Sequence, residues 1–249
     1  MKDNPYILLV EAESDKSFFE KLLKQNYFLE KGVTPDIKII EPTEQVDKND
    51  KSAKQGGKGN AIDKLPTMIK LLESQKLLKI ALIIDADSIK SGGGVKNTIK
   101  QISEKIDGKT GEKIKSQGYT YFENINKKTH EGFIFRDATA RKLPDINVWI
   151  MPNNADEGYL EYFIKSNLKS EEEILLKYAE ACIENLPKPT KFKDVRRQKA
   201  ELATYLAFQE TPGTNLAGVI GAGLIDLTQG TVKNLMDWLI HTFPKIESL

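Results

Sequence analysis

The chain has 249 residues, 39% of them hydrophobic and 29% charged, which is enough apolar material for one large α/β domain with or without a helical addition. Its 37 Lys and Arg residues and 36 Asp and Glu residues give a net charge of +1, so only a local basic patch would argue for nucleic-acid binding. The single cysteine, Cys182, excludes an internal disulfide framework and a cysteine metal cluster.

The start of the chain, Met-Lys-Asp-Asn-Pro-Tyr, has no signal-peptide pattern. No apolar run approaches the ~18 residues that a membrane-spanning helix requires. We therefore expect a soluble, cytoplasmic protein without a membrane partner.

The first expected strand is Tyr6-Ile-Leu-Leu-Val10, and Glu11 follows it directly. Residues 16–23 then have apolar side chains at helical spacing, and Ser14 or Asp15 is suited to cap that helix as a structural residue. Glu11 differs from both, because it ends an apolar strand.

A short strand is expected at 36–40, followed by a polar loop over 41–60 that is rich in lysine and glycine. Lys54 and Lys58 lie in this loop, which lacks the spacing of a P-loop. Contact with phosphate and simple solvated flexibility are equally compatible with such a loop. A helix over 62–75 then leads to the next strand, which gives a β-α-β order.

The stretch Ile80-Ala-Leu-Ile-Ile-Asp-Ala-Asp87 predicts a strand buried on both faces of a parallel sheet. Side chains alternate along a strand, so Asp85 and Asp87 are expected to project on the same side, about 6.5 Å apart. Two like charges at a sheet edge are explained most simply by a divalent cation such as Mg²⁺. The alternative is a pair of ordinary turn or helix-capping aspartates.

Glu11 strengthens the metal hypothesis. If its strand lies beside that of Asp85 and Asp87 in a parallel sheet, three carboxylates meet at the edge where open α/β sheets bind ligands. Such a group is difficult to explain without a metal, because the charges repel one another and lose hydration.

After a helix expected at 95–106, candidate edge strands or a hairpin lie at 118–122 and 132–135, and a further sheet strand at 146–151. The helix that follows places Glu157 and Glu161 four residues apart, on one face. Glu157 is also explained as a first-turn acid that complements the helix dipole, and this explanation suits Glu161 less well.

The C-terminal third predicts helices at 170–186, 192–210 and 228–241. The second has a basic start that includes Arg196, Arg197 and Lys199. Such a cluster is usually a solvated face, but beside an acidic metal site it could contact a phosphate backbone.

The pairing of Leu-Leu-Val-Glu11-Ala-Glu-Ser-Asp15 with Leu-Ile-Ile-Asp85-Ala-Asp87 resembles the Toprim domain of topoisomerases, bacterial primases, recombination-repair proteins and overcoming-lysogenization-defect (OLD) nucleases. Glu11 matches that family's glutamate, Asp85 and Asp87 match its metal-binding aspartates, and Asp15 matches its trailing aspartate. Ala12 departs from the usual glycine without removing a ligand.

The chain is similar in particular to small bacterial proteins of domain-of-unknown-function family 3226, through the segment Ile-Met151-Pro-Asn-Asn…Glu157-Gly-Tyr-Leu-Glu161 and through the tail that begins at Lys199. This likeness covers most of the chain, and only the first two motifs are chemically specific. It implies a metal-dependent phosphodiester site and leaves nuclease activity open.

We accordingly predict an α/β fold: a Toprim-like, mainly parallel sheet flanked by helices over residues 1–165, with a mainly helical part over 166–249 packed on it. The functional hypothesis is a nuclease dependent on Mg²⁺ or Mn²⁺ that acts on DNA or RNA. The topoisomerase tyrosine domain and the additional primase domains are not recognisable, whereas an OLD-type nuclease needs only acidic ligands, a basic group and water.

In this hypothesis Asp85 and Asp87 hold the metal, and Glu11 is a further ligand or the general base. Asp15, Glu157 and Glu161 complete the list of candidate ligands, with the last two at a second metal position. Lys58 or Lys199 stabilises charge on the phosphate. The expected nucleic-acid contacts are Lys54, Lys58, Arg196, Arg197 and Lys199.

Two alternatives remain open. One is a catalytically silent Toprim module that binds nucleic-acid ends, nucleotides or a partner in a defence or repair complex, and the near-zero net charge favours it modestly. The other is a phosphatase or phosphotransferase for small molecules. A separate ATPase chain is the partner expected from the likeness to OLD nucleases, and the oligomeric state is left open.

Overall fold

The computed structural model describes residues 4–39, 57–106, 119–122, 131–137 and 142–245. Its centre is a six-stranded sheet in the order β2-β1-β3-β6-β5-β4. The bounds of the strands are Tyr6–Val10 for β1, Asp36–Ile39 for β2, Lys79–Asp85 for β3, Tyr119–Phe122 for β4, Phe133–Asp137 for β5 and Ile146–Met151 for β6. The first four strands in the sheet order are parallel, and β5 and β4 add an antiparallel edge.

The apolar runs of β1 and β3 are buried on both faces, as predicted for a parallel sheet. Leu8, Val10 and Ile83 face one hydrophobic core, whereas Leu9 and Leu82 face the other. This alternation follows from the two-residue period of a strand. The sequence prediction of an α/β fold with β1 and β3 as parallel neighbours is confirmed.

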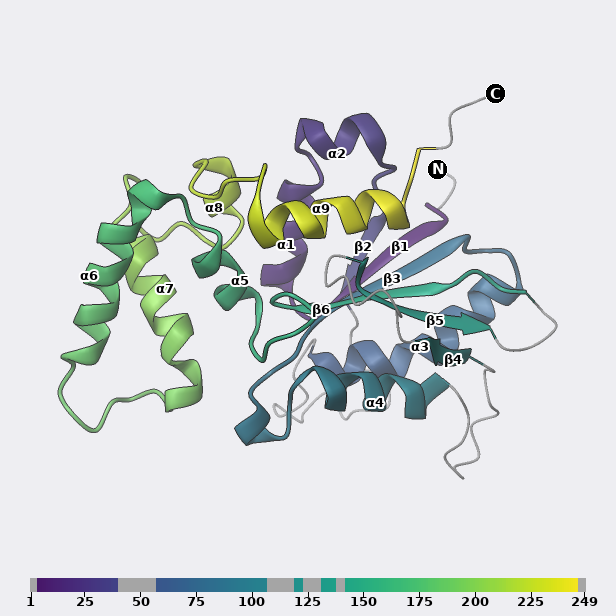
Figure 1. The fold of residues 1–249 in the computed structure, drawn as a ribbon, viewed down its shortest axis with the longest axis horizontal. Coiled ribbons are helices and arrows are strands. Elements are labelled where there is room, and N and C mark those ends of the chain that lie inside the picture. Colours follow the sequence, from purple (N-terminus) through teal and green to yellow (C-terminus); the bar gives the residue numbers. More distant parts are fainter. Residues whose placement is uncertain (1–3, 40–56, 107–118, 123–130, 138–141, 246–249) are drawn as a thin grey trace, which may run out of the picture.

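Helices cover both faces of the sheet (Figure 1). The first face carries α1, α2 and α9, and the second carries α3 and α4. Their bounds are Glu13–Leu22 for α1, Asn26–Lys31 for α2, Lys58–Glu73 for α3, Val95–Ile106 for α4 and Gly230–Thr242 for α9. The helix α3 begins four residues before the expected position 62, so Lys58 belongs to its first turn and not to the preceding loop.

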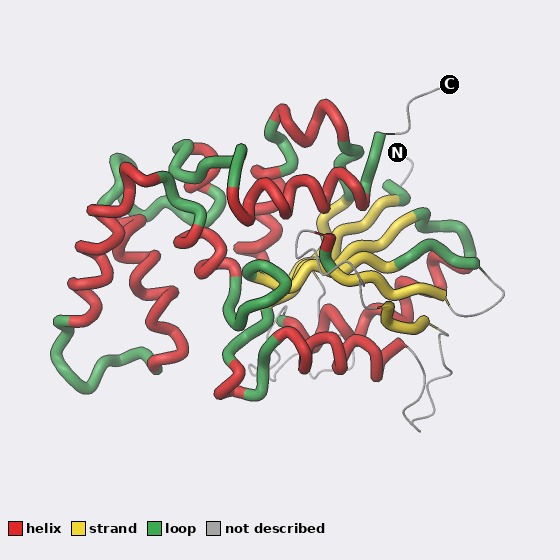
Figure 2. Tube along the Cα trace, viewed as in Figure 1, coloured by secondary structure: helices red, strands yellow, loops and turns green. Residues whose placement is uncertain are grey.

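The remaining helices form an all-helical region at one end of the sheet, where no strand is drawn (Figure 2). They are α5 at Leu160–Ser166, α6 at Glu173–Glu184, α7 at Arg197–Ala207 and the short α8 at Gly218–Gly221. Leu202 and Tyr205 of α7 belong to the same hydrophobic core as Leu8 of β1. The described part of the chain contains no helix that is long and apolar enough to cross a membrane.

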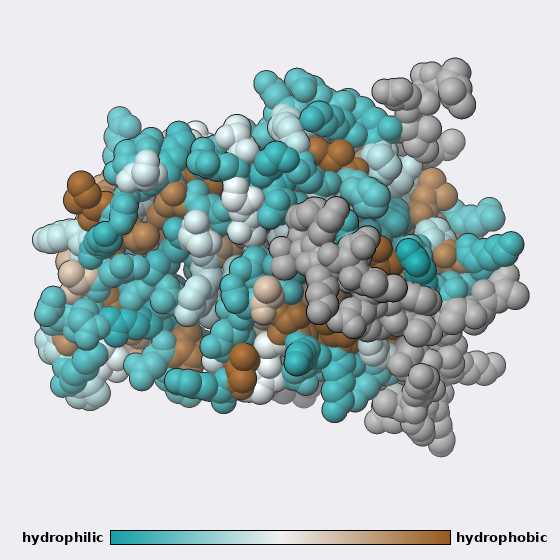
Figure 3. Space-filling model, viewed as in Figure 1, coloured by the Kyte–Doolittle hydropathy of each residue, from teal (hydrophilic) through white to brown (hydrophobic). Residues whose placement is uncertain are grey.

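Hydrophobic side chains are scattered among hydrophilic ones over the α6–α7 region in the view of Figure 3. Ile174 and Tyr178 of α6 are exposed, and so is Phe208 just after α7. The rings of Tyr178 and Phe208 contact each other, with centroids 5.7 Å apart, and exposed apolar residues in such small numbers are normal on a protein surface.

The central strand should dominate the stability of the fold. Leu82 of β3 is completely buried, so Leu82→Ala removes apolar contacts and leaves a cavity that should lower the free energy of unfolding by about 2–5 kcal/mol. The matched control is Leu78→Ala, because Leu78 is 50% exposed just before the same strand and should change stability by less than about 1 kcal/mol. Urea denaturation monitored by circular dichroism measures both, and equal effects would contradict this account of the core.

Candidate functional site

Glu11 and Asp85 meet at the carboxyl ends of two neighbouring parallel strands. Glu11 follows β1 directly, and Asp85 is the last residue of β3. The backbone N–H of Asp85 donates a hydrogen bond of 2.7 Å to Oε1 of Glu11. The parallel pairing therefore produces the convergence that was predicted from the sequence.

The carboxylate of Asp85 is fixed from a second direction by the start of α5. The backbone N–H of Leu160, the first residue of that helix, donates to Oδ1 of Asp85 at 3.2 Å. Glu161, the next residue, points toward the same region with only 12% of its side chain exposed. The start of α5 therefore brings the carboxylate of Glu161 close to that of Asp85.

Asp15 completes a group that we call the acidic cluster, which consists of Glu11, Asp15, Asp85 and Glu161. Asp15 has the capping role considered for it, because its Oδ2 accepts the backbone N–H of Ala12 at 3.0 Å. Its charge also acts on Asp85 and Glu11. The structural and electrostatic roles of Asp15 are therefore compatible.

Burial and mutual repulsion disfavour ionisation of Glu11, Asp15 and Asp85. Burial, aided by the charges of Asp87 and Asp15, raises the pKa of Glu11 to about 7, although the hydrogen bond from Asp85 acts in the opposite direction. Burial together with Glu161 raises the pKa of Asp15 to about 6. Burial, followed by the charge of Glu11, raises the pKa of Asp85 well above its ordinary value.

Two lysines supply positive charge around the acidic cluster. Nζ of Lys199 lies 3.1 Å from Oε1 of Glu161, and this carboxylate with those of Asp85 and Asp15 raises the pKa of Lys199 despite the opposing effect of burial. Nζ of Lys58 donates to Oδ2 of Asp87 at 3.2 Å and to the backbone oxygen of Ala86 at 3.1 Å. Both lysines proposed from the sequence thus lie beside candidate carboxylates.

The expected geometry of Asp87 is wrong. The strand ends at Asp85, and Asp87 adopts a left-handed conformation with φ +63°, so the alternation that would place the two side chains 6.5 Å apart is interrupted. The backbone N–H of Asp87 donates to the oxygen of Gly158 at 2.9 Å. Gly93 packs against this turn so closely that a Cβ would lie 2.6 Å from Cβ of Asp87, which explains a glycine there.

Glu157 does not share a helix face with Glu161, which corrects another expectation. The helix α5 begins at Leu160, so Glu157 lies in the preceding loop. Its carboxylate instead accepts the backbone N–H of Ile89. Glu157 therefore stabilises the loop after β3 and is not a member of the acidic cluster.

The helix α7 is held against α5 by an ionic network around Lys165. Nζ of this lysine lies 2.6 Å from Oε2 of Glu201 and 2.7 Å from Oε1 of Glu180. Arg197 also contacts Glu201, with Nε 2.8 Å from Oε1. Because Glu201 is buried, this network fixes the position from which Lys199 reaches Glu161.

The proposed nucleic-acid contacts differ in their surroundings. Arg197 forms ion pairs with Glu201 and Glu184 and belongs to the helical scaffold. Arg196 is exposed at the end of a 3-10 turn that spans Asp194–Arg196. Lys54 lies outside the described residues.

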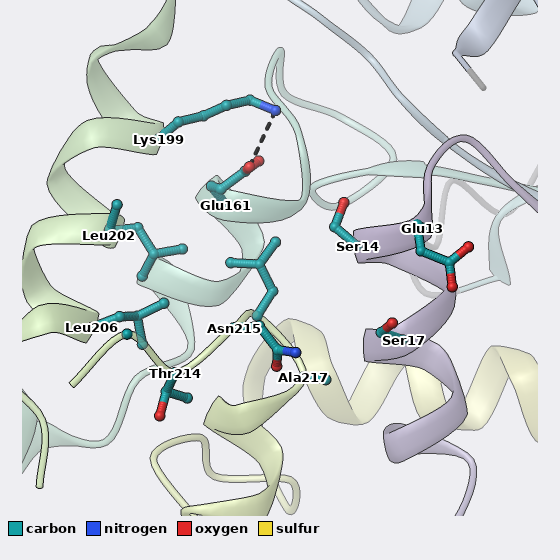
Figure 4. A pocket seen from close by; sticks show the side chains of 13 residues that line it. Glu13, Ser14, Ser17, Glu161, Lys199, Leu202, Leu206, Thr214, Asn215 and Ala217 are labelled. Carbon is teal, nitrogen blue, oxygen red and sulfur yellow. Dashed lines mark ion pairs between the residues drawn. The ribbon is translucent and has the colours of Figure 1, made fainter. Parts of the chain in front are cut away.

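A groove of about 530 Å³ opens beside Glu161 and Lys199. Figure 4 shows Leu202 and Leu206 of α7 on one side and Ser14 and Ser17 of α1 on the other. The segment 213–217 lies at the end remote from the ion pair. No sequence signal indicated this groove, because its walls come from segments far apart in the chain.

The donor chemistry of the acidic cluster fits a hard divalent cation. Glu11 and Asp85 each use one oxygen to accept a backbone N–H, and their second oxygens accept no hydrogen bond from the described residues. Among those residues, no group of three or more Asp, Glu, His or Cys side chains has an arrangement that could hold a metal ion. Two carboxylates and several waters are nevertheless a common environment for Mg²⁺.

The raised pKa values predict how stability depends on pH in metal-free buffer. A carboxyl group with a higher pKa in the folded state stabilises the fold fully below its unfolded pKa and loses that contribution as the pH rises through the folded value. Glu11 changes from 4.5 to about 7, so its contribution to the free energy of unfolding should fall by roughly 3 kcal/mol between pH 4.5 and 8.

Glu11→Gln should reduce that dependence, whereas Glu13→Gln, at an exposed position of the same segment, should leave it intact. Urea denaturation at pH 5 and pH 8 in the presence of EDTA measures the effect. If the wild type gains stability relative to Glu11→Gln between pH 5 and pH 8, the predicted sign is wrong.

Comparison with known proteins gives one match, which covers nearly the whole chain. The family described as "Protein of unknown function (DUF3226)" matches residues 5–244 and therefore includes both the sheet and the helical region. No curated protein and no solved structure matches the chain. The chain belongs to the DUF3226 family.

Proposed function

We propose that this protein is a nuclease that hydrolyses phosphodiester bonds of DNA or RNA with the help of Mg²⁺ or Mn²⁺. The observation that carries the proposal is the pair of buried carboxylates, Glu11 and Asp85, joined at the ends of parallel strands with Asp15 and Glu161 around them. A divalent cation would offset the burial and the mutual repulsion that raise the pKa values of Glu11 and Asp85. The resemblance of the two motifs to the Toprim domain supports the same chemistry.

The residues that would hold the cation are Asp85 and Glu11, with Asp87 as the adjustable ligand. When bound, the cation supplies Lewis-acid polarisation of a phosphoryl oxygen and lowers the pKa of a water molecule. Glu11 would be a further ligand or, where Asp85 and Asp87 hold the cation without it, the general base that accepts the proton of the attacking water. Oε1 of Glu11 already accepts the backbone N–H of Asp85. Its Oε2 can therefore serve as a metal ligand or as a general base, but not as both.

The lysines have complementary roles in the proposal. Lys199 is held by Glu161 at the edge of the acidic cluster, where its charge would stabilise the phosphate as negative charge builds up. Lys58 forms an ion pair with Asp87, at 3.2 Å between Nζ and Oδ2. Glu161 would be free to contribute to a second metal position when Lys199 pairs with a phosphate.

A catalytically silent module is the second candidate, and a specific observation favours it. Asp87 and Glu161 already form ion pairs with lysines, and the described residues do not form a set of three metal ligands. A domain that has replaced its metal with lysines could still bind nucleic-acid ends, nucleotides or a partner such as a separate ATPase. Metal binding is the property on which the two candidates differ.

Asp85→Asn should abolish metal binding and cleavage, because backbone amides fix the Asp85 carboxylate beside Glu11 at the strand end. We expect Mg²⁺ or Mn²⁺ to raise the unfolding temperature of the wild type, and to have no effect on the variant. Asp63→Asn is the control, since Asp63 is an exposed residue of α3 that pairs with Lys105 of α4 and is not part of the acidic cluster. Differential scanning calorimetry measures the unfolding temperature. If neither cation raises that of the wild type, the result favours the silent module.

Cleavage itself is tested on supercoiled plasmid, linear DNA and RNA with Mg²⁺ or Mn²⁺. Asp85→Asn and Glu11→Gln should each reduce the rate by roughly 100-fold or more, the scale expected when a metal ligand or a general base is removed. Asp63→Asn should retain the wild-type rate. Cleavage that survives in Asp85→Asn would refute the proposed reaction.

A further inference from the structure

The groove between α1 and α7 shares two of its lining residues, Glu161 and Lys199, with the surroundings of the acidic cluster. We infer that this groove binds a single unpaired nucleobase of the substrate, next to the phosphate group on which the acidic cluster would act. The inference rests on the proposed function. It narrows the substrate to a nucleic-acid strand with at least one unpaired base.

The lining suits a nucleobase, which has apolar faces and a polar edge. Leu202, Leu206 and Leu216 supply apolar surface, and the hydroxyls of Ser14 and Ser17 lie across the groove from α7 (Figure 4). The amide of Asn215 can both donate and accept hydrogen bonds at the far end. Binding sites for small organic groups have this composition, with mostly apolar walls and a few polar groups.

The distribution of charge indicates which end of the groove would hold the phosphate and which part would hold the base. Among the described residues that line the groove, Lys199 is the one cation, and it is at the end next to the acidic cluster. Glu161 lies at the same end as Lys199, and a phosphate at the other end, beside the segment 213–217, would meet no cation among the described residues of the lining. The arrangement therefore favours an uncharged ring inside the groove and the phosphate at Lys199.

The volume is sufficient for one base and its sugar. A cavity of about 530 Å³ falls in the range of ~300–1,000 Å³ typical for small-molecule sites. Proteins that select single strands place unstacked bases against side chains in this manner, since a paired base presents only its edge. A duplex would have to open at its end, at an energetic cost, before a base could enter.

The test is to fill the groove from a position that tolerates a larger side chain. Ala203 lines the groove and is exposed on α7, so Ala203→Phe should block it without disturbing the core. Ala207→Phe is the matched control, because Ala207 is exposed on the same helix and does not line the groove. Thermal unfolding of both variants verifies that the fold is kept.

Binding is measured by fluorescence anisotropy with a labelled oligothymidylate and with the same strand made entirely of abasic sites. The binding buffer contains Ca²⁺ in place of Mg²⁺. Ca²⁺ can bind the carboxylate oxygens of the site, and its different coordination geometry is expected to suppress cleavage during the measurement. Ala203→Phe should weaken binding of the base-bearing strand about tenfold, as expected for the loss of one bound base. Ala207→Phe should not, and the abasic strand should bind all three proteins equally.

The outcomes separate this inference from the proposed function. If wild type and Ala203→Phe bind the base-bearing strand equally, or if the variant loses the abasic strand to the same extent, the base-binding role is wrong while the nuclease proposal stands. If the wild type binds neither strand and cleaves no nucleic acid, both fail. A loss confined to the base-bearing strand supports the inference, whichever polymer the enzyme prefers to cleave.

Discussion

The hydrogen bond from the Asp85 amide to the Glu11 carboxylate is the interaction on which the geometry of the site depends. It forms because β1 and β3 are adjacent, parallel and in a register that brings their carboxyl ends level. The same arrangement removes both carboxylates from water and places them in each other's field, which is why their pKa values rise. Two apolar cores, one on each face of the sheet, keep the strands in this position. The fold thus supplies the free energy that holds an unfavourable group of charges together.

Features that depend on local patterns were predictable from the sequence. The apolar run at Tyr6–Val10 is strand β1, the periodic segment at Val95–Ile106 is helix α4, and Ile146–Met151 is strand β6, all with the expected bounds. The convergence of Glu11 with Asp85 was also predictable, because parallel neighbours bring their strand ends to one edge. These predictions succeed because burial of apolar residues on both faces of a strand is recorded in the residues of that strand itself.

The errors arise where a backbone turn or a distant segment determines the geometry. The backbone turns away from the strand at Asp87, which adopts a left-handed conformation. Its N–H donates to the backbone oxygen of Gly158, which is 71 residues later in the chain. Glu157 is directed away from Glu161 because α5 begins three residues after it, at Leu160. Arg197 has its charge paired within the helical region, and that depends on Glu184 in another helix. No periodicity within a segment carries this information.

The two ion pairs at the site differ in how readily they can change, and this difference bears on how a cation would bind. Asp87 is the half-exposed partner of the enclosed Lys58 and lies in the turn after β3, so Asp87 is the member of this pair that can reorient toward a metal ion. Glu161 has an enclosed side chain and receives Lys199 from a helix fixed by the buried Glu201 network, so that pair is held by the architecture. Asp85 and Glu11 are held by backbone amides and cannot move independently of the sheet. A cation would therefore find two fixed ligands at the strand ends and one adjustable ligand at Asp87, while Lys199 keeps its place for the phosphate.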